Sequence, residues 1–187
     1  MRPRVRWVGT GLLVVCCALG LGCGSKKSTL TGPSPALPDP ALTSPENTLI
    51  AMIHAYANRD TVELARVYDD GYQGTSIDQG DWAPVALTFT KADEMRHVAN
   101  LAARTTISHI SINLNPVIRR YADTADPAGW ASLQNPLRTV EIEDAGTTYD
   151  VYLSYETLTY KFIPTTPDST SPTDTTWKIV RWSEVAF

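Results

Sequence analysis

Cysteine is scarce in this chain of 187 residues, and all three cysteines lie near the N-terminus, at Cys16, Cys17 and Cys23. The part of the chain that follows Cys23 can therefore form no disulfide of its own. It also offers no thiolate as a nucleophile or as a metal ligand. A domain in that part has to be stabilised by its hydrophobic core alone.

Clusters of positive charge are also missing. Lys and Arg number 16 against 20 Asp and Glu, which gives a net charge of −4, and no run of basic residues is longer than a pair. Nucleic-acid binding depends on clustered cations that neutralise phosphates. The composition therefore predicts no nucleic-acid partner.

No apolar run is long enough to cross a bilayer comfortably, since a spanning helix takes about 20 apolar residues. One short uncharged segment, residues 7–22, follows a basic stretch that contains Arg2, Arg4 and Arg6. A basic region followed by a short apolar region is typical of a secretory signal. We therefore interpret residues 1–22 as a signal peptide, whose removal would leave thirteen basic residues and a net charge of about −7.

The signal ends in "LGLGCGSKKS", which resembles the lipobox of bacterial lipoproteins, although Gly20 stands where that family prefers leucine. The resemblance implies cleavage after Gly22 and lipidation of Cys23. The lipid would hold the protein in the cell membrane or the outer membrane, with the domain in the periplasm or at the cell surface. The residue after Cys23 is Gly24, whereas lipoproteins that are retained at the inner membrane commonly have an aspartate there. If the host has two membranes, this favours the outer membrane. The alternative is a plain secretory signal.

Residues 23–43 comprise the cysteine and the segment "GSKKSTLTGPSPALPDPALT". Prolines among Gly, Ser and Thr leave too few apolar side chains to offset the entropy lost on ordering. We therefore predict a disordered tether. The remaining residues, 44–187, have the ordinary length of a single domain.

The first part of this domain carries the signals of helix starts. In "SPENTLIAMIHAYANRD", Ser44 and Pro45 mark a start, and apolar residues then recur at helical spacing. Asp60 is placed to cap a short second helix, and Thr90 with Asp93 resembles a capping box ahead of a third. The segment "DDGYQGTSIDQGD", between the second and third helices, has the composition of a loop.

After Arg104 the apolar period becomes that of a strand. We predict strands in "TISHISINLNP", "VIRRYAD", "LRTVEIED", "TTYDVYLSYETLTYKFIP" and "WKIVRWSEVAF". The fourth segment is long enough to require a bend or a bulge. Helices followed by strands predict an α+β fold, with the helices on one face of a curved antiparallel sheet.

This order of elements resembles the nuclear-transport-factor-2-like superfamily, which includes the SnoaL-like proteins. The resemblance covers residues 44–187 and rests on "YANRD" at the end of the first helix, "DTVELARVYDDGY" after it and "WKIVRW" in the last strand. It implies a cone-shaped, cystatin-like fold, in which a strongly curved antiparallel sheet is wrapped by N-terminal helices around a pocket. It also implies frequent dimers through the outer face of the sheet. It implies no single activity, and no motif transfers a catalytic position to this chain.

The histidines and carboxylates of the domain form no recognisable catalytic or metal-binding motif. His54, His97 and His109 lack the spacing of a zinc site. Asp69 and Asp70 fall in the apparent loop, where solvent opposes the burial that a general acid needs. We therefore predict no catalytic residue, no metal and no cofactor.

Three aromatic residues are the candidates for the wall of a pocket: Tyr56, Trp82 and Trp182. Tyr56 belongs to the apolar face of the first helix. In the last strand, strict alternation places Val180 and Trp182 on one face and Ile179 on the other. The two cations between the tryptophans therefore face opposite sides, so we interpret this segment as the closing strand of a sheet.

These observations favour a lipid-anchored envelope protein whose domain is a non-catalytic module for a small apolar ligand or a protein partner. One alternative is a SnoaL-like enzyme, of the isomerase, dehydratase or hydrolase type, that performs acid–base chemistry on a hydrophobic substrate. Another is a homodimeric scaffold that associates through the outer face of its sheet. The enzyme would need a carboxylate or a histidine inside an apolar cavity.

Overall fold

The computed structural model describes residues 39–79, 84–153, 156–165 and 175–186. Cys23, most of the predicted tether and Trp82 lie outside these ranges. Within them, no helix has the length and apolar character that crossing a membrane would require.

All three predicted helices are present, and each begins where the sequence places its start. They are α1 (Pro45–Asn58), α2 (Thr61–Val67) and α3 (Lys91–Ala103). The Ser44 side chain accepts a hydrogen bond from the backbone of Asn47 and so caps α1. Asp60 caps α2 in the same way, and Thr90 with Asp93 forms the expected capping box at α3.

The described strands form two sheets. The strands are β1 (Tyr68–Asp78), β2 (Val85–Thr90), β3 (Ile107–Leu114), β4 (Arg119–Tyr121), β5 (Ala131–Gln134), β6 (Leu137–Asp144), β7 (Thr147–Tyr152), β8 (Glu156–Thr165) and β9 (Thr176–Ala186). One sheet has the order β2-β1-β9-β8-β5-β4 and the other the order β3-β6-β7. The chain passes from β5 to β6 through Asn135 and Pro136, so the two sheets are joined at this point.

The prediction of a loop in "DDGYQGTSIDQGD" is wrong, because most of this segment forms β1. Tyr72, Gly74 and Ser76 are buried and alternate with the more exposed Gln73 and Thr75. The strand has few large apolar residues and several of Gly, Asp, Ser and Gln, which hid its two-residue period. It pairs antiparallel with β2 and parallel with β9, so the larger sheet is mixed rather than wholly antiparallel.

The long segment "TTYDVYLSYETLTYKFIP" forms two strands that belong to different sheets. β7 pairs with β6, whereas β8 pairs with β5 and β9. Where the sequence predicted a bend within one strand, the chain leaves the three-stranded sheet and enters the six-stranded one. This change places β7 at the edge of the three-stranded sheet, where all six of its residues are exposed.

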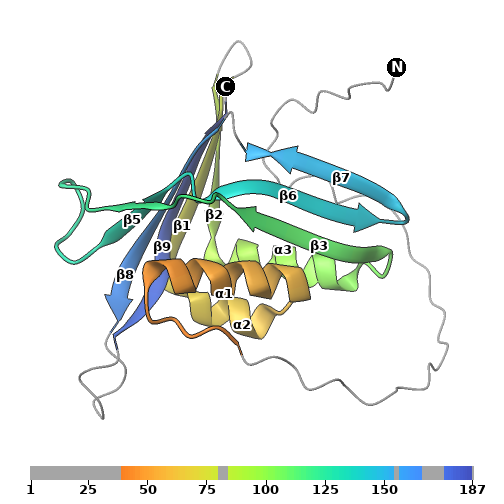
Figure 1. The fold of residues 1–187 in the computed structure, drawn as a ribbon, viewed down its shortest axis with the longest axis horizontal. Helices are drawn as coiled ribbons and strands as arrows, with labels where there is room; N and C mark the ends of the chain where they lie inside the picture. Colours follow the sequence, from red (N-terminus) through yellow and green to blue (C-terminus); the bar gives the residue numbers. More distant parts are fainter. Residues whose placement is uncertain (1–38, 80–83, 154–155, 166–174, 187) are drawn as a thin grey trace.

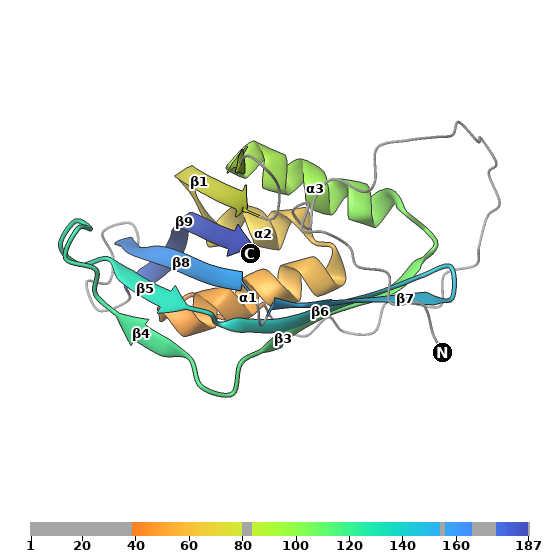
Figure 2. The same ribbon diagram turned by 90° about the horizontal axis from the view of Figure 1, so that it is seen from above.

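The helices lie against one face of the six-stranded sheet, and the three-stranded sheet extends along their other side (Figures 1 and 2). The core between these layers includes Leu49, Leu64, Phe162 and Ile179, each of which is 0 % exposed. Burial of such a side chain contributes roughly 1.5–3 kcal/mol. The predicted α+β fold, a curved sheet wrapped by N-terminal helices, is confirmed.

The packed part of the chain begins before Ser44, where the sequence placed the start of the domain. Leu42 is buried, and its carbonyl oxygen accepts a hydrogen bond of 2.8 Å from the backbone of Trp177 on β9. Arg66 of α2 forms an ion pair of 2.6 Å with Asp39. Residues 39–43 therefore belong to the described fold.

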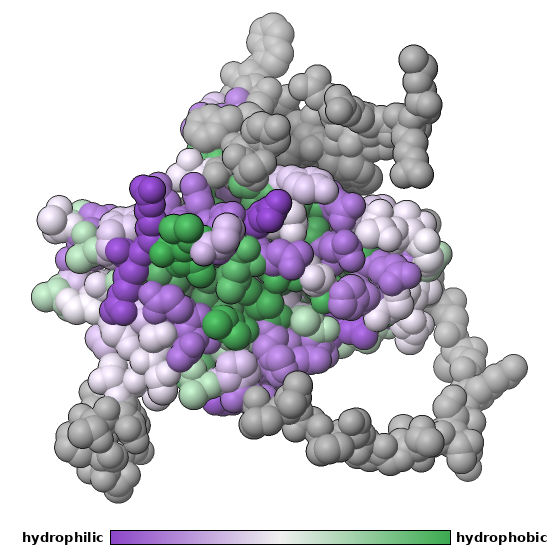
Figure 3. All heavy atoms as spheres, viewed as in Figure 1, coloured by the Kyte–Doolittle hydropathy of each residue, from purple (hydrophilic) through white to green (hydrophobic). Residues whose placement is uncertain are grey.

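One face of the molecule carries a compact group of apolar side chains over α1, surrounded by polar residues (Figure 3). On this helix, Ile50 is 42 % exposed. Ordinary soluble proteins commonly expose an apolar patch, so the patch alone indicates no partner.

Candidate functional site

A buried carboxylate, Glu94, stands where α1, α3 and β1 meet. It lies one turn before Val98 on the inward face of α3 and is only 4 % exposed. Tyr56 of α1 donates a hydrogen bond of 2.5 Å to Glu94 Oε2, and Tyr72 of β1 donates one of 2.9 Å to Oε1. Each carboxylate oxygen therefore has a tyrosyl hydroxyl as its partner.

The surroundings of Glu94 oppose its ionisation. Burial raises the pKa of the Glu94 carboxyl, and this effect outweighs the two tyrosyl hydrogen bonds, which act to lower it. Burial also raises the pKa of Tyr56 and of Tyr72, and the negative charge of Glu94 raises both further. Both hydroxyls therefore remain protonated donors at neutral pH.

Trp182 covers the neighbouring part of the sheet. It lies opposite Tyr160 of β8 and beside Gly74 of β1 in the register of β9. A methyl group at Gly74 would stand 2.7 Å from the Tyr72 hydroxyl and 2.9 Å from the Trp182 ring. The absence of a side chain at Gly74 thus allows the indole to pack against β1.

A second buried carboxylate follows on the same face of β9. Glu184 is 7 % exposed and accepts a hydrogen bond of 3.1 Å from Ser76 of β1. Burial raises the pKa of Tyr160, and the charges of Glu94 and Glu184 raise it further. The interior between α3 and the sheet therefore combines aromatic rings with two buried carboxylates, Glu94 of α3 and Glu184 of β9.

One buried nitrogen atom near this cluster, His97 Nδ1, has no hydrogen-bond partner among the described residues. His97 lies one turn after Glu94 on α3, with its ring centroid 5.9 Å from that of Tyr56. Burial lowers the pKa of His97 to about 4, so its imidazole is neutral at pH 7. A neutral imidazole nitrogen without a partner could bind a polar group that reached it.

A bulge in β9 decides which of its side chains point inward. The register with β8 shifts between Ile179, which pairs with Phe162, and Arg181, which pairs with Lys161. As a result Ile179 and Val180 are both buried, and the strict alternation expected from the sequence fails at this point.

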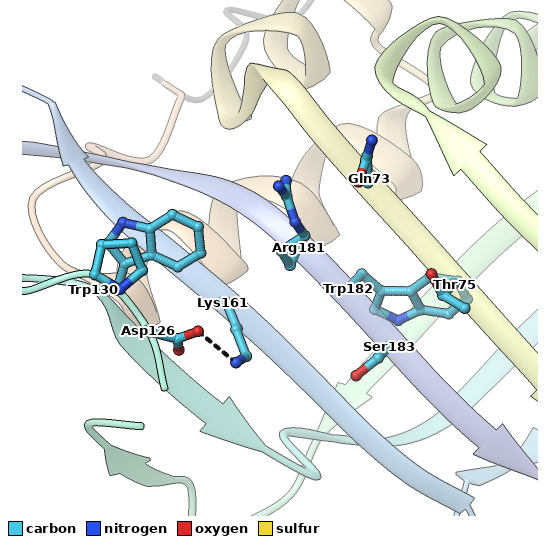
Figure 4. Close-up of a pocket in the computed structure, with 9 residues that line it drawn as sticks. Gln73, Thr75, Asp126, Trp130, Lys161, Arg181, Trp182 and Ser183 are labelled. Atoms are coloured by element: carbon cyan, nitrogen blue, oxygen red, sulfur yellow. Dashed lines mark hydrogen bonds and ion pairs between the residues drawn. The ribbon is translucent and has the colours of Figure 1, made fainter. Parts of the chain in front are cut away.

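An open hollow lies on the face of the six-stranded sheet that is turned away from the helices (Figure 4). Its volume is about 470 Å³, and it is bounded by the 122–130 segment before β5 and by β1, β8 and β9. Its lining includes Gln73, Thr75, Trp130, Lys161, Arg181 and Ser183. The hollow is therefore mainly polar, with indole surface at its wall.

The cations of the hollow are held in place by their neighbours. Lys161 Nζ lies 2.7 Å from Asp126 and 3.0 Å from Asp123, and these hydrogen bonds contribute to a raised pKa for the Lys161 ammonium. Arg181 donates to the carbonyl oxygen of Gly71 at 2.8 Å, and its guanidinium lies 6.0 Å from the centroid of the Trp130 ring. Such fixed donors beside an aromatic face suit ligand binding.

The three aromatic candidates from the sequence have different outcomes. Tyr56 lies at the buried carboxylate, and Trp182 lies on the inner face of β9 and also borders the outer hollow. Trp82 is outside the described residues. Whether these residues line a ligand pocket stays a prediction.

Sequence reasoning missed Glu94, the residue that organises the interior. One signal could have found it: Glu94, Val98 and Leu101 fall at i, i+4 and i+7 of one helix, so the carboxylate shares the face of two buried apolar residues. A charged residue in such a stripe has to be buried or neutralised, which marks it as a candidate site.

One group of side chains among the described residues could hold a metal ion. Asp39, His54 and Glu63 bring three ligand atoms within 4.8 Å of one another.

Comparison with known proteins shows likeness of fold only. No family model matches the sequence, and no curated protein matches it. A conserved protein from Planctomyces limnophilus has a similar structure, with a TM-score of 0.51 at 12% identity over 75% of this chain and 91% of that one.

Two further solved structures overlap this one less closely. An NTF2-like protein with a cystatin-like fold from Novosphingobium aromaticivorans has a TM-score of 0.46 at 11% identity, covering 75% of this chain and 77% of that one. A candidate dehydratase from the NTF2-like family of Streptomyces avermitilis has a TM-score of 0.47 at 16% identity, covering 75% and 91%. At such identities no activity transfers from these proteins to this chain.

Proposed function

We propose that this protein is an exported lipoprotein, anchored through Cys23, whose single domain binds a small ligand in the hollow on the outer face of its sheet. The lipobox-like sequence supports the anchor. The hollow of about 470 Å³, with its fixed donors and its indole surface, supports the binding role.

One observation favours a binding module over an enzyme: Glu94, the carboxyl whose pKa is raised, does not line the open hollow. Glu94 is 4 % exposed, and both of its oxygen atoms are occupied by tyrosyl hydroxyls. Asp126, a carboxylate of the hollow, is paired with Lys161 at 2.7 Å, which suits it to positioning that cation. The accessible groups are therefore suited to binding.

The lining favours a more polar ligand than the apolar one predicted from the sequence. Gln73, Thr75 and Ser183 offer amide and hydroxyl groups, and Arg181 offers a planar cation. Trp130 adds a flat apolar surface beside that cation. A small molecule with hydroxyl or carboxylate groups and one apolar face, such as a sugar or a sugar acid, fits this chemistry.

Trp130→Ala is expected to weaken this binding by about tenfold or more, because it removes the aromatic wall of the hollow. Ligand-detected NMR would measure it, with mono- and disaccharides and uronic acids as probes and the mature protein in detergent. Tyr149→Ala is the matched control, since Tyr149 is an exposed aromatic residue of β7 outside the hollow. Equal binding by Trp130→Ala and wild type, or saturable dimerisation through this face in place of ligand binding, would contradict the proposal.

Cys23→Ala is expected to release the protein from the membrane, because the lipid chains are what retain it. Expression in a bacterium that processes lipoproteins, followed by cell fractionation and labelling with radioactive palmitate, measures both anchoring and lipidation. Cys17→Ala should remain labelled and membrane-bound. Label that persists in Cys23→Ala would refute the anchor and leave the binding role of the hollow untouched.

A second candidate function, acid–base catalysis on a hydrophobic substrate, is favoured by the Glu94 cluster. A carboxyl whose pKa is raised holds its proton to a higher pH than an exposed glutamate does, and the tyrosyl hydroxyls beside it could donate to a substrate carbonyl oxygen that replaced Glu94 as their acceptor. His97 Nδ1, which has no partner among the described residues, would add a further polar contact. Incubation with cyclic hydroxyketones, followed by mass spectrometry, tests this role. Turnover that is equal in wild type and Glu94→Gln would exclude Glu94 as the acid or base.

A further inference from the structure

Three potential metal ligands meet where α1, α2 and the segment before α1 come together. His54 Nδ1 of α1 lies 2.7 Å from Glu63 Oε2 of α2. Asp39 supplies a carboxylate oxygen as the third ligand atom, and the three ligand atoms lie within 4.8 Å of one another. The three side chains come from separate segments of the chain, which is why no spacing in the sequence indicated them.

Glu63 adds an independent observation that points to a cation. Its side chain is 2 % exposed, and its Oε1 atom is buried without a hydrogen-bond partner among the described residues. A buried carboxylate is costly unless its charge and both of its oxygen atoms are compensated. Within the described part of the chain, the Glu63 carboxylate therefore lacks a partner for its Oε1 atom and a permanent positive charge beside it.

The neighbouring cation does not remove this deficit. Arg66 pairs with Asp39 at 2.6 Å, at a place where both side chains are nearly half exposed. Among the described residues, the Glu63 carboxylate is paired with His54 alone, and an imidazole carries a positive charge only when it is protonated. Two carboxylates and a neutral imidazole around one point are the donor set of a divalent metal ion.

We propose that Asp39, His54 and Glu63 bind a divalent transition-metal ion of the zinc or manganese class, with water completing its coordination. One imidazole nitrogen and two carboxylates suit these ions, whereas calcium and magnesium take oxygen ligands. Bonds of about 2.1 Å in a tetrahedral arrangement would separate two ligand atoms by about 3.4 Å. His54 and Glu63, now 2.7 Å apart, would separate by roughly 0.7 Å to reach this distance, and the partly exposed Asp39 side chain would close on them from within 4.8 Å.

The ion would join the N-terminal segment to the helical face of the domain. Asp39 is the first described residue, and Leu42 already packs into the core. Bound metal would fix the chain at residue 39 and so define where the domain leaves its proposed membrane tether. This last consequence rests on the proposed anchor at Cys23, whereas the metal site itself does not.

Isothermal titration calorimetry of the mature protein in detergent, with zinc sulfate and separately with manganese chloride, tests the site. We expect one ion per chain and a melting temperature that rises by at least about 3 °C at saturation. Glu63→Gln and Asp39→Asn, which retain size but lose the charge, should each weaken binding by about tenfold or more. His109→Ala is the matched control, because His109 is exposed on β3, away from this cluster.

The outcomes are distinct. Zero stoichiometry with both metals would overturn the proposal, and so would unchanged affinity in Asp39→Asn, which is a surface change that spares the core. Loss of binding in His109→Ala would place the ion elsewhere. A visible spectrum of four-coordinate cobalt(II) that is present in wild type and absent in Glu63→Gln would support ligation by these side chains. None of these results depends on whether the outer hollow binds a ligand.

Discussion

Glu94→Ala is expected to lower the free energy of unfolding by about 2–4 kcal/mol, because it removes the acceptor of two tyrosyl hydrogen bonds. The hydroxyls of Tyr56 and Tyr72 would remain in the interior without a partner, beside a new cavity. Urea denaturation followed by circular dichroism measures the loss. Glu143→Ala, at a partly exposed glutamate of β6, should change stability by less than about 0.5 kcal/mol.

Glu94→Gln distinguishes the contribution of the hydrogen bonds to stability from the contribution of the charge. Its amide can accept from one hydroxyl and donate to the other oxygen, so it should retain most of the stability that alanine loses. Above the raised pKa of Glu94 it should be at least as stable as wild type, because the variant does not bury an ionised carboxylate. A glutamine variant that is as unstable as the alanine variant would contradict the role assigned to this carboxylate.

The pH dependence of stability follows from the direction of the pKa shift. The pKa of Glu94 is raised in the folded protein, so the folded state keeps this proton to a higher pH than the unfolded state does. The resulting stabilisation is fully present below the pKa of an unfolded glutamate, about 4.3. It is lost as the pH rises through the raised value of the folded protein. In Glu94→Gln this loss of unfolding free energy with rising pH should be absent. A series of urea denaturations at increasing pH would show it.

Gly74→Ala is expected to lower the free energy of unfolding by about 1–3 kcal/mol through overpacking. The new methyl group would lie 2.7 Å from the Tyr72 hydroxyl and 2.9 Å from the Trp182 ring, so both side chains would have to move. Tryptophan fluorescence should report the displacement of the indole, and urea denaturation the loss of stability. Thr75→Ala is the control, because the next residue of β1 faces the outer hollow.

Gly74 and Glu94 should also be coupled through Tyr72. If the methyl group displaces the Tyr72 hydroxyl, Glu94 loses one donor, and the two substitutions act on the same contact. A double-mutant cycle of Gly74→Ala with Glu94→Gln should then give a coupling energy of at least about 0.5 kcal/mol. Strict additivity, with unchanged fluorescence in Gly74→Ala, would show that Trp182 and Tyr72 do not pack as described.

Local signals of the sequence were sufficient for the helices and for several of the strands. Ser44, Asp60 and Thr90 cap the three helices because each short polar side chain satisfies backbone N–H groups that have no partner within the helix. The two-residue period of "TISHISINLNP" likewise predicted a strand, and in β3 Ile110 is buried and His109 exposed, as that period requires. These features depend on neighbours within a few residues, which is why sequence alone was enough.

The sequence by itself thus determined the fold class, the caps of the helices and a closing strand built around Trp177 and Trp182. Only the tertiary structure decided that a strand of glycine, glutamine and serine lies between β2 and β9, since its pairing partners are distant in the chain. It also decided that Glu94 meets two tyrosines, and that Glu63 meets His54 and the region of Asp39. The physical reason is common to all three: burial and charge compensation depend on groups that folding brings together, and no local period records them.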